Sequence, residues 1–266
     1  MEFLTIDIGG SGVKIANFSF SNRKLLLKNE PAHYSNPDWS NFEKWLIEIN
    51  GCNSSTIGIS SAGFVDSKNG VVKMFRVGGW IDRNIKNEIE RLLPNAKVFI
   101  LNDAEAHLAA HTDTYDNSQL CITLGTSLGF AISDSLGNVY RPPDNINFDL
   151  GEIELPTRAS NRHVWWSLGS HGLQELQQNL GEHDGVIHFG YRLGAFLKNI
   201  CSIFRPQSVV FCGGIAEKYW NDIRHPIINE FAHSKPDWLT TPQFYISQYG
   251  KNSALWGMAK HLSKQY

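Results

Sequence analysis

One stretch near the start of the chain decides the fold: Phe3-Leu4-Thr5-Ile6-Asp7-Ile8-Gly9-Gly10-Ser11-Gly12-Val13-Lys14-Ile15-Ala16. An apolar run, a glycine-rich break and a second apolar run predict a β-hairpin. Asp7 stands in the first strand beside the turn, where strand propensity alone does not favour a carboxylate. Glycines let the backbone approach an anion, and successive N–H groups in such a turn can bind phosphate. The stretch therefore indicates either a phosphate loop or an ordinary hairpin whose glycines relieve turn strain.

Two widespread phosphate-binding motifs do not fit this stretch. A dinucleotide-binding fingerprint requires glycine at its third and sixth places, where Ser11 and Lys14 stand. A Walker loop requires Gly-Lys-Ser/Thr, whereas Lys14 follows Val13 and precedes Ile15. The hairpin is therefore neither of these motifs.

The same pattern returns in the second half of the chain. It reads Leu120-Cys121-Ile122-Thr123-Leu124-Gly125-Thr126-Ser127-Leu128-Gly129-Phe130-Ala131-Ile132. After each hairpin, at Asn17 to Leu27 and at Ser133 to Tyr140, the sequence predicts a turn and a third strand. Two similar units, each opening about half of the chain, imply a duplicated architecture with two phosphate loops facing one another. This repetition favours anion binding over an ordinary hairpin.

The composition is that of an ordinary globular protein. The 266 residues are 42% hydrophobic and 19% charged, and the formal net charge of −2 argues against a nucleic-acid partner. No apolar run is long enough to span a bilayer, and the N-terminus lacks the pattern of a signal peptide. The widely spaced cysteines are interpreted as buried thiols, which favours a cytoplasmic protein without a membrane partner. They are Cys52, Cys121, Cys201 and Cys212.

Polar residues follow two predicted strands of the first half. Thr56 to Asp66 reads as a buried strand entering a small-residue turn at Gly63, which fits either a ligand or close packing. Lys97 to Leu101 is another buried strand, and it leads to Asn102 and Asp103 at the start of a helix. A carboxylate beyond the carboxyl end of a strand is where α/β folds bind ligands, but Asp is also a common helix N-cap.

The second half continues with alternating elements. Asn147 to Glu154 holds three carboxylates, which fit either the outer face of a strand or a set of acceptors for hydroxyl groups. Val186 to Phe204 predicts a long amphipathic helix. A buried strand from Ser208 ends in Gly213-Gly214, which opens another helix, and Ser253 to Leu262 predicts a terminal helix.

In this order, the motifs resemble those of the ROK family of sugar kinases, which belong to the actin-like ATPase superfamily. The match covers nearly the whole chain, and the spelling of the first loop and Leu150-Gly151 is most similar to polyphosphate glucokinases and glucomannokinases. The matching segments are Asp7 to Lys14, Ala62 to Asp66, Gly79-Trp80, Asn102 to Ala106, Gly125 to Gly129, Cys212 to Ile215 and Ala254 to Gly257.

The resemblance implies an α/β fold with two lobes, the actin-like ATPase (ribonuclease H-like) fold with a duplicated sheet-and-helix core. The N-terminal lobe would comprise residues 1–114, joined by the returning C-terminal helix 251–266. Residues 115–250 would form the C-terminal lobe. Asp7, Asp103 and Gly125 are then expected to line one cleft between the lobes.

The resemblance also implies a role for each site residue. Asp103 would be the catalytic base, and Asp7 would bind Mg²⁺ through water. The substrate-binding residues would be Gly63, Asn102, Asp103, Asp149 and Glu152. The residues that bind the phosphates and the adenosine of ATP would be Asp7, Gly9, Gly10, Ser11, Gly12, Lys14, Gly125, Thr126, Gly213 and Gly214.

The implied activity is Mg²⁺-dependent transfer of a phosphoryl group from ATP to a hydroxyl of a hexose or hexose-like sugar. Polyphosphate is the alternative donor, although its long anionic chain would favour a basic groove that the overall charge does not indicate. A sugar-sensing regulator of the same fold is the alternative function. Repressors of the family carry an added N-terminal DNA-binding region, whereas here the first strand begins by Phe3. A small sugar is the expected partner, and a homodimer is compatible with the family.

Three positions depart from the family pattern. The sugar-binding Glu-x-Gly-His reads Asp149-Leu150-Gly151-Glu152, so an acceptor-only carboxylate replaces an imidazole. The cysteine-rich zinc segment of many relatives is absent, so no structural zinc is expected. Ser127 replaces the middle glycine of the second loop, which would introduce strain if that residue needs a positive φ.

Overall fold

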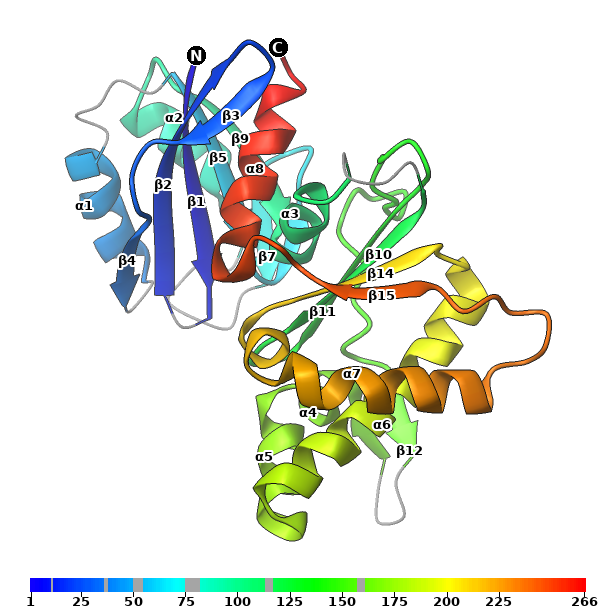
Figure 1. Ribbon diagram of the computed structural model, residues 1–266. Helices are drawn as coiled ribbons and strands as arrows, with labels where there is room; N and C mark the ends of the chain where they lie inside the picture. The colour runs from blue at the N-terminus through cyan, green and yellow to red at the C-terminus, as the bar shows by residue number, and fades with distance from the viewer. Residues whose placement is uncertain (11, 36–37, 50–54, 75–81, 113–116, 157–160) are drawn as a thin grey trace. The chain divides into compact units, whose positions relative to one another are not determined.

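The computed structural model describes residues 1–10, 12–35, 38–49, 55–74, 82–112, 117–156 and 161–266. The chain divides into two compact units. Unit 1 comprises Met1–Asp113, Arg141–Phe148 and Asn252–Tyr266, and unit 2 comprises Thr114–Tyr140 and Asp149–Lys251. Each unit is a sheet packed against helices (Figure 1).

Unit 1 is built on a six-stranded sheet. Its order is β3-β2-β1-β5-β9, and β4 pairs with the other end of β2. The pairs β1–β2, β2–β3 and β2–β4 are antiparallel, whereas β1–β5 and β5–β9 are parallel. The strands are β1 (Glu2–Gly9), β2 (Gly12–Ser21), β3 (Lys24–Leu27), β4 (Ala32–Ser35), β5 (Thr56–Ser61) and β9 (Lys97–Asn102).

The decisive stretch forms the β1–β2 hairpin that the sequence predicts. Asp7 pairs with Lys14 and Gly9 with Gly12, so the turn lies between the two glycines. The strand β2 continues to Ser21, beyond the predicted turn at Asn17. The chain reverses instead at Asn22 and Arg23, which adopt left-handed backbone conformations with φ of 52° and 59°.

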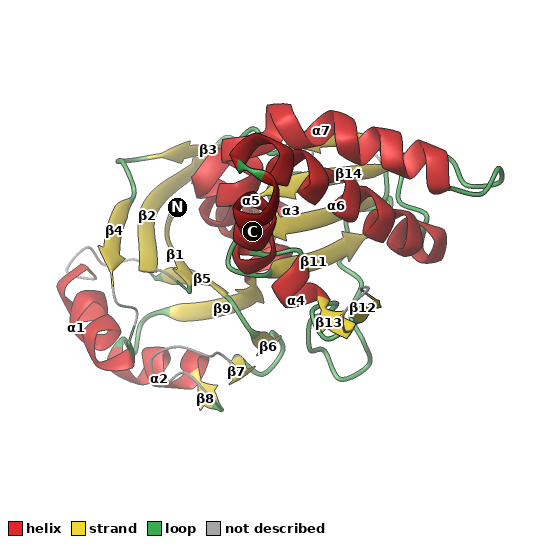
Figure 2. Ribbon diagram, turned by 90° about the horizontal axis from the view of Figure 1, so that it is seen from below, coloured by secondary structure: helices red, strands yellow, loops and turns green. Residues whose placement is uncertain are grey.

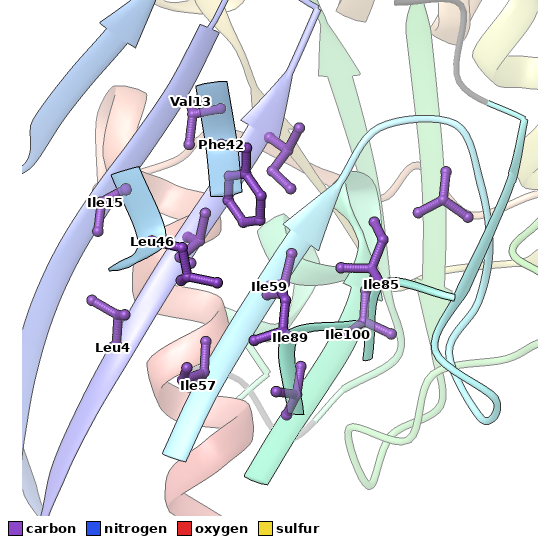
Figure 3. Close-up of a cluster of buried hydrophobic side chains, with 14 of the residues drawn as sticks. Leu4, Val13, Ile15, Phe42, Leu46, Ile57, Ile59, Ile85, Ile89 and Ile100 are labelled. Carbon is purple, nitrogen blue, oxygen red and sulfur yellow. The ribbon is translucent and has the colours of Figure 1, made fainter. Parts of the chain in front are cut away.

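One face of this sheet carries the main core of unit 1. Leu4, Ile6 and Ile8 alternate along β1 and pack with Ile57 and Ile59 of β5, as the two-residue period of a strand requires. Helices α1 (Trp39–Ile49) and α2 (Ile85–Leu92) cover this face with Phe42, Leu46, Ile85 and Ile89 (Figure 3). Figure 2 shows both helices on the side of the sheet away from α3 (Asp103–Ala109).

The opposite face is covered by α3 and by the terminal helix α8 (Ser253–Ser263). Phe3, Ala16 and Phe18 of the sheet pack with Leu255, Ala259 and Leu262 of α8. The two helices pack so closely that a Cβ atom at Gly257 would overlap the carbonyl oxygen of Ala106. Asp7 lies on this face, because it alternates with Ile6 and Ile8.

A small three-stranded sheet follows β5 in unit 1. It consists of β6 (Phe64–Asp66), β7 (Val71–Met74) and β8 (Arg83–Asn84) in the order β6-β7-β8. The segment Arg141–Phe148 returns to this sheet, where Ile146 forms an isolated bridge with Asp66. The Oδ1 atom of Asn147 also accepts a hydrogen bond from Val65 N at 2.8 Å.

Unit 2 repeats the hairpin on a four-stranded sheet of order β11-β10-β14-β15, in which β10–β11 is antiparallel and the other pairs are parallel. Helix α7 packs on the sheet and lies beside α6, which in turn contacts α5 (Figures 1 and 2). The strands are β10 (Gln119–Leu124), β11 (Leu128–Ser133), β14 (Ser208–Cys212) and β15 (Gln243–Ile246). The helices are α4 (Val164–Ser167), α5 (Ser170–Leu180), α6 (Glu182–Phe204) and α7 (Gly214–Ser234). A two-stranded sheet joins β12 (Glu154–Pro156) to β13 (Asn161–His163).

The predicted third strand at Ser133 to Tyr140 is reduced to one bridge, between Ser133 and Val139. Asp134 is the physical reason, because its Oδ1 atom accepts hydrogen bonds from the backbone N–H groups of Leu136 and Asn138. Such local bonds compete with a regular strand ladder. Among the described residues, no helix combines the length and the apolar character needed to cross a membrane.

The contact between α3 and α8 yields a first prediction. Gly257→Ala should lower the free energy of unfolding by about 1–3 kcal/mol, the usual cost of forcing extra atoms into a packed core. The check is the midpoint of urea-induced unfolding. Gly214→Ala is the matched control, because a Cβ there meets nothing within 4 Å. Equal midpoints for the wild type and Gly257→Ala would show that the two helices can separate without cost.

Candidate functional site

Asp7 is the carboxylate at the carboxyl end of β1, and it is 8% exposed. Its Oδ1 atom accepts a hydrogen bond of 2.9 Å from the Ser60 hydroxyl of β5. Its Oδ2 atom lies 3.3 Å from Nζ of Lys14, its antiparallel partner on β2. The pairing of β1 with both strands therefore places a hydroxyl and an ammonium group on the same carboxylate.

Asn102 and Asp103 lie where β9 passes into α3. Asn102 is the N-cap: its Oδ1 atom accepts a 2.9 Å hydrogen bond from Ala104 N, and Glu105 completes a capping box. Asp103 is the first residue of the helix, and its Oδ1 atom also accepts from Ala104 N, at 2.8 Å. The capped helix start fixes the backbone of both candidate residues.

The environment of Asp103 disfavours its charge. Desolvation by the surrounding protein raises the pKa of this carboxyl to about 6, and the nearby charge of Asp7 acts in the same direction. The charge of His107 and the hydrogen bonds from Ala104 and Asn102 lower the pKa and limit the rise. A carboxyl with a pKa near 6 is mostly ionised at neutral pH, yet it is a stronger base than an ordinary aspartate.

Gly63 is joined to this site by a hydrogen bond. Its carbonyl oxygen accepts from Nδ2 of Asn102 at 2.9 Å. Gly63 has a φ of 94°, a backbone conformation that residues other than glycine rarely adopt. The Oδ1 and Nδ2 atoms of Asn102 thus each have a hydrogen-bond partner, which fixes the orientation of the side chain.

The buried ion pair between Glu105 and Arg141 was not predicted from the sequence. Arg141 Nε and Nη2 donate to Glu105 Oε1 and Oε2 at 2.6 and 2.8 Å, and the Glu105 side chain is only 2% exposed. The Asn-x-x-Glu spacing was a sequence signal for Glu105, since it is that of a capping box. Nothing local pointed to Arg141, which lies 36 residues further along the chain.

The carboxylates of unit 1 suit Mg²⁺ better than a metal caged by protein ligands alone. Within the described residues, no three or more His, Cys, Asp or Glu side chains gather into a metal-binding group. Mg²⁺ usually keeps several waters and binds one or two carboxylates together with substrate phosphates. Asp7 and Asp103 interact as like charges, and a divalent cation beside them would relieve that repulsion. The residues present therefore fit Mg²⁺ bound through water and phosphate.

The first predicted phosphate loop is described except for Ser11. Gly9 ends β1, Gly10 lies in the turn, and Gly12 begins β2. A Cβ at Gly12 would lie 2.6 Å from the carbonyl oxygen of Tyr34, so only glycine fits beside β4. Ser11, like the Gly79-Trp80 motif, lies outside the described residues.

The second loop joins β10 to β11 in unit 2. Gly125 N donates to Ser127 O at 3.1 Å, and Gly125 O accepts from Ser170 N at 3.0 Å. A Cβ at Gly125 would meet nothing within 4 Å, so the space beside this loop is open. Ser127 is not among the described residues with a positive φ, so serine at this place causes no left-handed strain.

Gly213 and Gly214 join β14 to α7. Gly213 has a φ of 91°, and a Cβ there would lie 2.5 Å from the carbonyl oxygen of Leu124, so glycine is required on both grounds. Gly214 is the first residue of α7, and a Cβ there would meet nothing within 4 Å. The helix therefore begins beside open space at the carboxyl end of β14.

Asp149 and Glu152 lie together in unit 2, in the turn before β12. Asp149 Oδ1 accepts a 2.6 Å hydrogen bond from Gly151 N, which fixes the turn. The Glu152 side chain is 55% exposed, with Oε2 3.6 Å from Nδ1 of His163 on β13. The imidazole of His163 thus stands next to the carboxylate of Glu152.

The candidate residues fall into two groups. Unit 1 brings together Asp7, Lys14, Gly63, Asn102 and Asp103. Unit 2 holds Gly125, Thr126, Asp149, Glu152, Gly213 and Gly214.

No family model matches the chain. It is 25% identical to the xylose repressor of Bacillus spizizenii in an alignment that covers 76% of this chain and 59% of the repressor. A second match, to the xylose repressor of Bacillus subtilis, is also 25% identical and covers 61% of this chain and 49% of that repressor. The chain therefore spans only about half to three fifths of the length of these relatives.

Solved structures match over the whole chain. A ROK family protein from Streptococcus pneumoniae, in complex with sucrose, gives a TM-score of 0.80 at 18% identity and covers both chains fully. A ROK glucokinase from Streptomyces griseus, in complex with glucose and AMPPNP, gives 0.79 at 18% identity and covers both chains fully. The polyphosphate/ATP-glucomannokinase from Arthrobacter gives 0.71 at 20% identity, covering 100% of this chain and 99% of that one. The chain therefore has the actin-like ATPase fold of the ROK sugar kinases, as its motifs predict.

Proposed function

We propose that the protein is a sugar kinase that transfers a phosphoryl group from ATP to a hydroxyl of a hexose or hexose-like sugar. The observation that carries this proposal is Asp103, a carboxyl whose pKa is raised to about 6 at the capped start of α3 and beside Asp7. A group with these properties suits a general base that takes a proton from an attacking hydroxyl. The fold shared with sugar kinases supports the same reaction class.

The residues of unit 1 have separable tasks in this proposal. Asp103 accepts the proton of the sugar hydroxyl as its oxygen bonds to the γ-phosphorus of ATP and the bond from that phosphorus to ADP breaks. Asn102, held by Gly63 and Ala104, orients the sugar beside that base. Phosphoryl transfer depends mainly on such positioning and on charge neutralisation rather than on covalent chemistry with the protein.

The donor side is assigned to Asp7 and to the glycine loops. Mg²⁺, when bound, neutralises charge on the donor phosphates, and Asp7 would hold it through water. The N–H groups of the loops at Gly9-Gly10 and Gly125-Thr126 would contact phosphate oxygens. Gly213-Gly214 would lie against adenosine, since the open start of α7 lets a ligand approach the backbone.

ATP is the proposed donor, and polyphosphate remains the rival. The structural likeness to a polyphosphate/ATP-glucomannokinase makes the comparison worthwhile. The net charge of −2 does not favour a long polyanion. Both donors therefore belong in the assay.

A sugar-responsive regulator is the second candidate function, and the similarity to two xylose repressors favours it. A regulator needs to bind a sugar but has no use for a base with a raised pKa. Xylose therefore belongs in the sugar panel. Calorimetric binding of xylose without turnover of any sugar would support the regulator and contradict the kinase.

The central prediction is that the wild type forms sugar phosphate from ATP and that Asp103→Asn loses about 10²–10⁴-fold in kcat, the usual contribution of a general base. ATP binding should be unchanged, because Asn keeps the shape of the side chain. Coupled detection of ADP and direct detection of sugar phosphate are the measurements. Asp38→Asn is the matched control, since Asp38 is likewise an aspartate at a helix start that accepts a backbone N–H, from Asn41, but has no role in the proposed site. Full activity of Asp103→Asn would mean that another group is the base.

The raised pKa of Asp103 predicts a pH dependence. Only the ionised carboxylate accepts a proton, so kcat/KM for the sugar should fall about tenfold per pH unit below pH 6 and level off above it. A profile that stays flat down to pH 5 would contradict the assignment.

The raised pKa of Asp103 also predicts how the free energy of unfolding depends on pH. The folded state binds a proton at Asp103 more tightly than the unfolded state does, so the ionised group destabilises the fold above about pH 6 and not near pH 4. Asp103→Asn should therefore unfold at higher urea concentration than the wild type at pH 8, with a smaller difference at pH 5.

Glu152 is the proposed specificity residue of the sugar site. Glu152→Ala should raise the sugar KM or lower kcat/KM by about 1–3 kcal/mol, the cost of leaving sugar hydroxyls without an acceptor, and leave the KM for ATP unchanged. Glu152→His should shift preference toward the sugars used by ordinary ROK glucokinases. Glu182→Ala, an exposed carboxylate at the start of α6, is the control. Wild-type kinetics of both Glu152 variants on every sugar tested would place this residue outside the site.

A further inference from the structure

We infer that the connecting segment, residues Arg141–Phe148, positions the catalytic base, and that Arg141 is a positioning residue for Asn102 and Asp103. The inference rests on the proposed function for the meaning of Asp103. The contacts that carry it all lie within unit 1.

The first contact is the ion pair between Arg141 and Glu105. It is bidentate, with Nε and Nη2 at 2.6 and 2.8 Å from the two carboxylate oxygens. Paired N–H···O bonds of this kind fix direction as well as distance. Glu105 is 2% exposed and Arg141 25%, so water does not replace the pair. Arg141 makes the shortest contacts of the Glu105 carboxylate, whose Oε2 atom also accepts from the Ser67 hydroxyl at 3.4 Å.

The second contact links Glu105 to the backbone next to Asp103, the candidate base. Glu105 Oε2 accepts the backbone N–H of Asn102 at 3.4 Å, as the second half of the capping box. Asn102 precedes Asp103 directly, and Oδ1 of Asn102 holds Ala104 N at 2.9 Å. A shift of Glu105 therefore moves the backbone on which Asp103 is mounted.

The third contact joins the far end of the connecting segment to the Gly63 turn. Asn147 Oδ1 accepts from Val65 N at 2.8 Å, and Ile146 bridges to Asp66. Gly63 in turn accepts from Asn102 Nδ2 at 2.9 Å. The contacts form a closed ring, which runs from Asn102 through Glu105, Arg141, the connecting segment and Val65 to Gly63, and back to Asn102.

Such a ring has a purpose beyond stability. A buried ion pair adds little net stability over well-packed apolar residues, because both charges must leave water. We infer that the ion pair serves to fix positions. An error of about 1 Å at a reacting group can cost on the order of 100-fold in rate. The ring fixes the Asn102 backbone through Glu105 and the Asn102 side chain through Gly63.

The test compares Arg141→Met with Arg83→Met. Arg83 of β8 forms an ion pair of 2.7 Å with Glu88 of α2 in the same unit, at side-chain exposures of 31% and 26%. We expect Arg141→Met to lower kcat for the sugar about 10- to 100-fold with the KM for ATP within twofold of wild type. Arg83→Met should keep both constants within twofold. Wild-type kcat in Arg141→Met would overturn the inference.

A second pair of variants separates positioning from stability. Glu105→Gln/Arg141→Met removes both charges and leaves no unpaired buried carboxylate, so its unfolding midpoint should return toward that of the wild type. Its kcat should stay low, because the bidentate contact is still missing. Arg141→Lys keeps the charge without the planar fork and should show an intermediate loss. Recovery of kcat together with stability in the double variant would reduce the role of Arg141 to a structural one.

Hydrogen exchange provides a readout that does not need turnover. The amides of Ala104 and Glu105 should exchange at least tenfold faster in Arg141→Met than in the wild type or in Arg83→Met. Unchanged exchange would overturn the inference even if the protein is a sugar kinase. If the wild type phosphorylates no sugar, the proposed function fails, and the exchange rates still decide whether Arg141 holds the start of α3.

Discussion

The parallel pairing of β1, β5 and β9 is the constraint on which the candidate site of unit 1 depends. Its register sets Asp7 opposite Ser60 and Ser61 opposite Asn102, so the polar residues of three strands meet at one edge of the sheet. Hydrophobic alternation enforces this register, because a slip of one residue would move Leu4, Ile6 and Ile8 out of the core. The chemistry at the edge is therefore fixed by apolar residues that take no part in it.

Local patterns predicted much of the fold, and contacts distant in sequence escaped prediction. Both hairpins, the strand leading to Asn102 and the double glycine before α7 follow from alternation and glycine placement within about ten residues. The bond between Glu105 and Arg141 spans 36 residues and has no local signature on the arginine side. Asp134 shows the opposite case, in which a local side-chain bond replaced a strand that the repeat suggested. Ser127 replaces a glycine of the family pattern without backbone strain, because it is not among the described residues with a positive φ.

The electrostatics of Asp103 combine two properties that suit a general base: a raised basicity and an ionised state at neutral pH. Low solvation raises its basicity, and the helix start with its capping residues keeps it ionisable at neutral pH. Neither effect could be obtained from the sequence alone, because an aspartate after a strand is more often a simple N-cap. The structure distinguishes the roles: Asn102 is the cap, and the carboxylate that follows is held in a poorly solvated place.

The close packing of α8 on α3 has a consequence for how the protein is made on the ribosome. The helix that carries Asp103 at its start packs against Asn252–Tyr266. This segment is made after Thr114–Tyr140 and Asp149–Lys251, which form the other unit. Unit 1 thus begins synthesis first and can complete its core last. Phe3 and Phe18 of its sheet lack their packing partners until α8 has been synthesised. During synthesis, α3 therefore stays without the packing of α8 until all of unit 2 has been made.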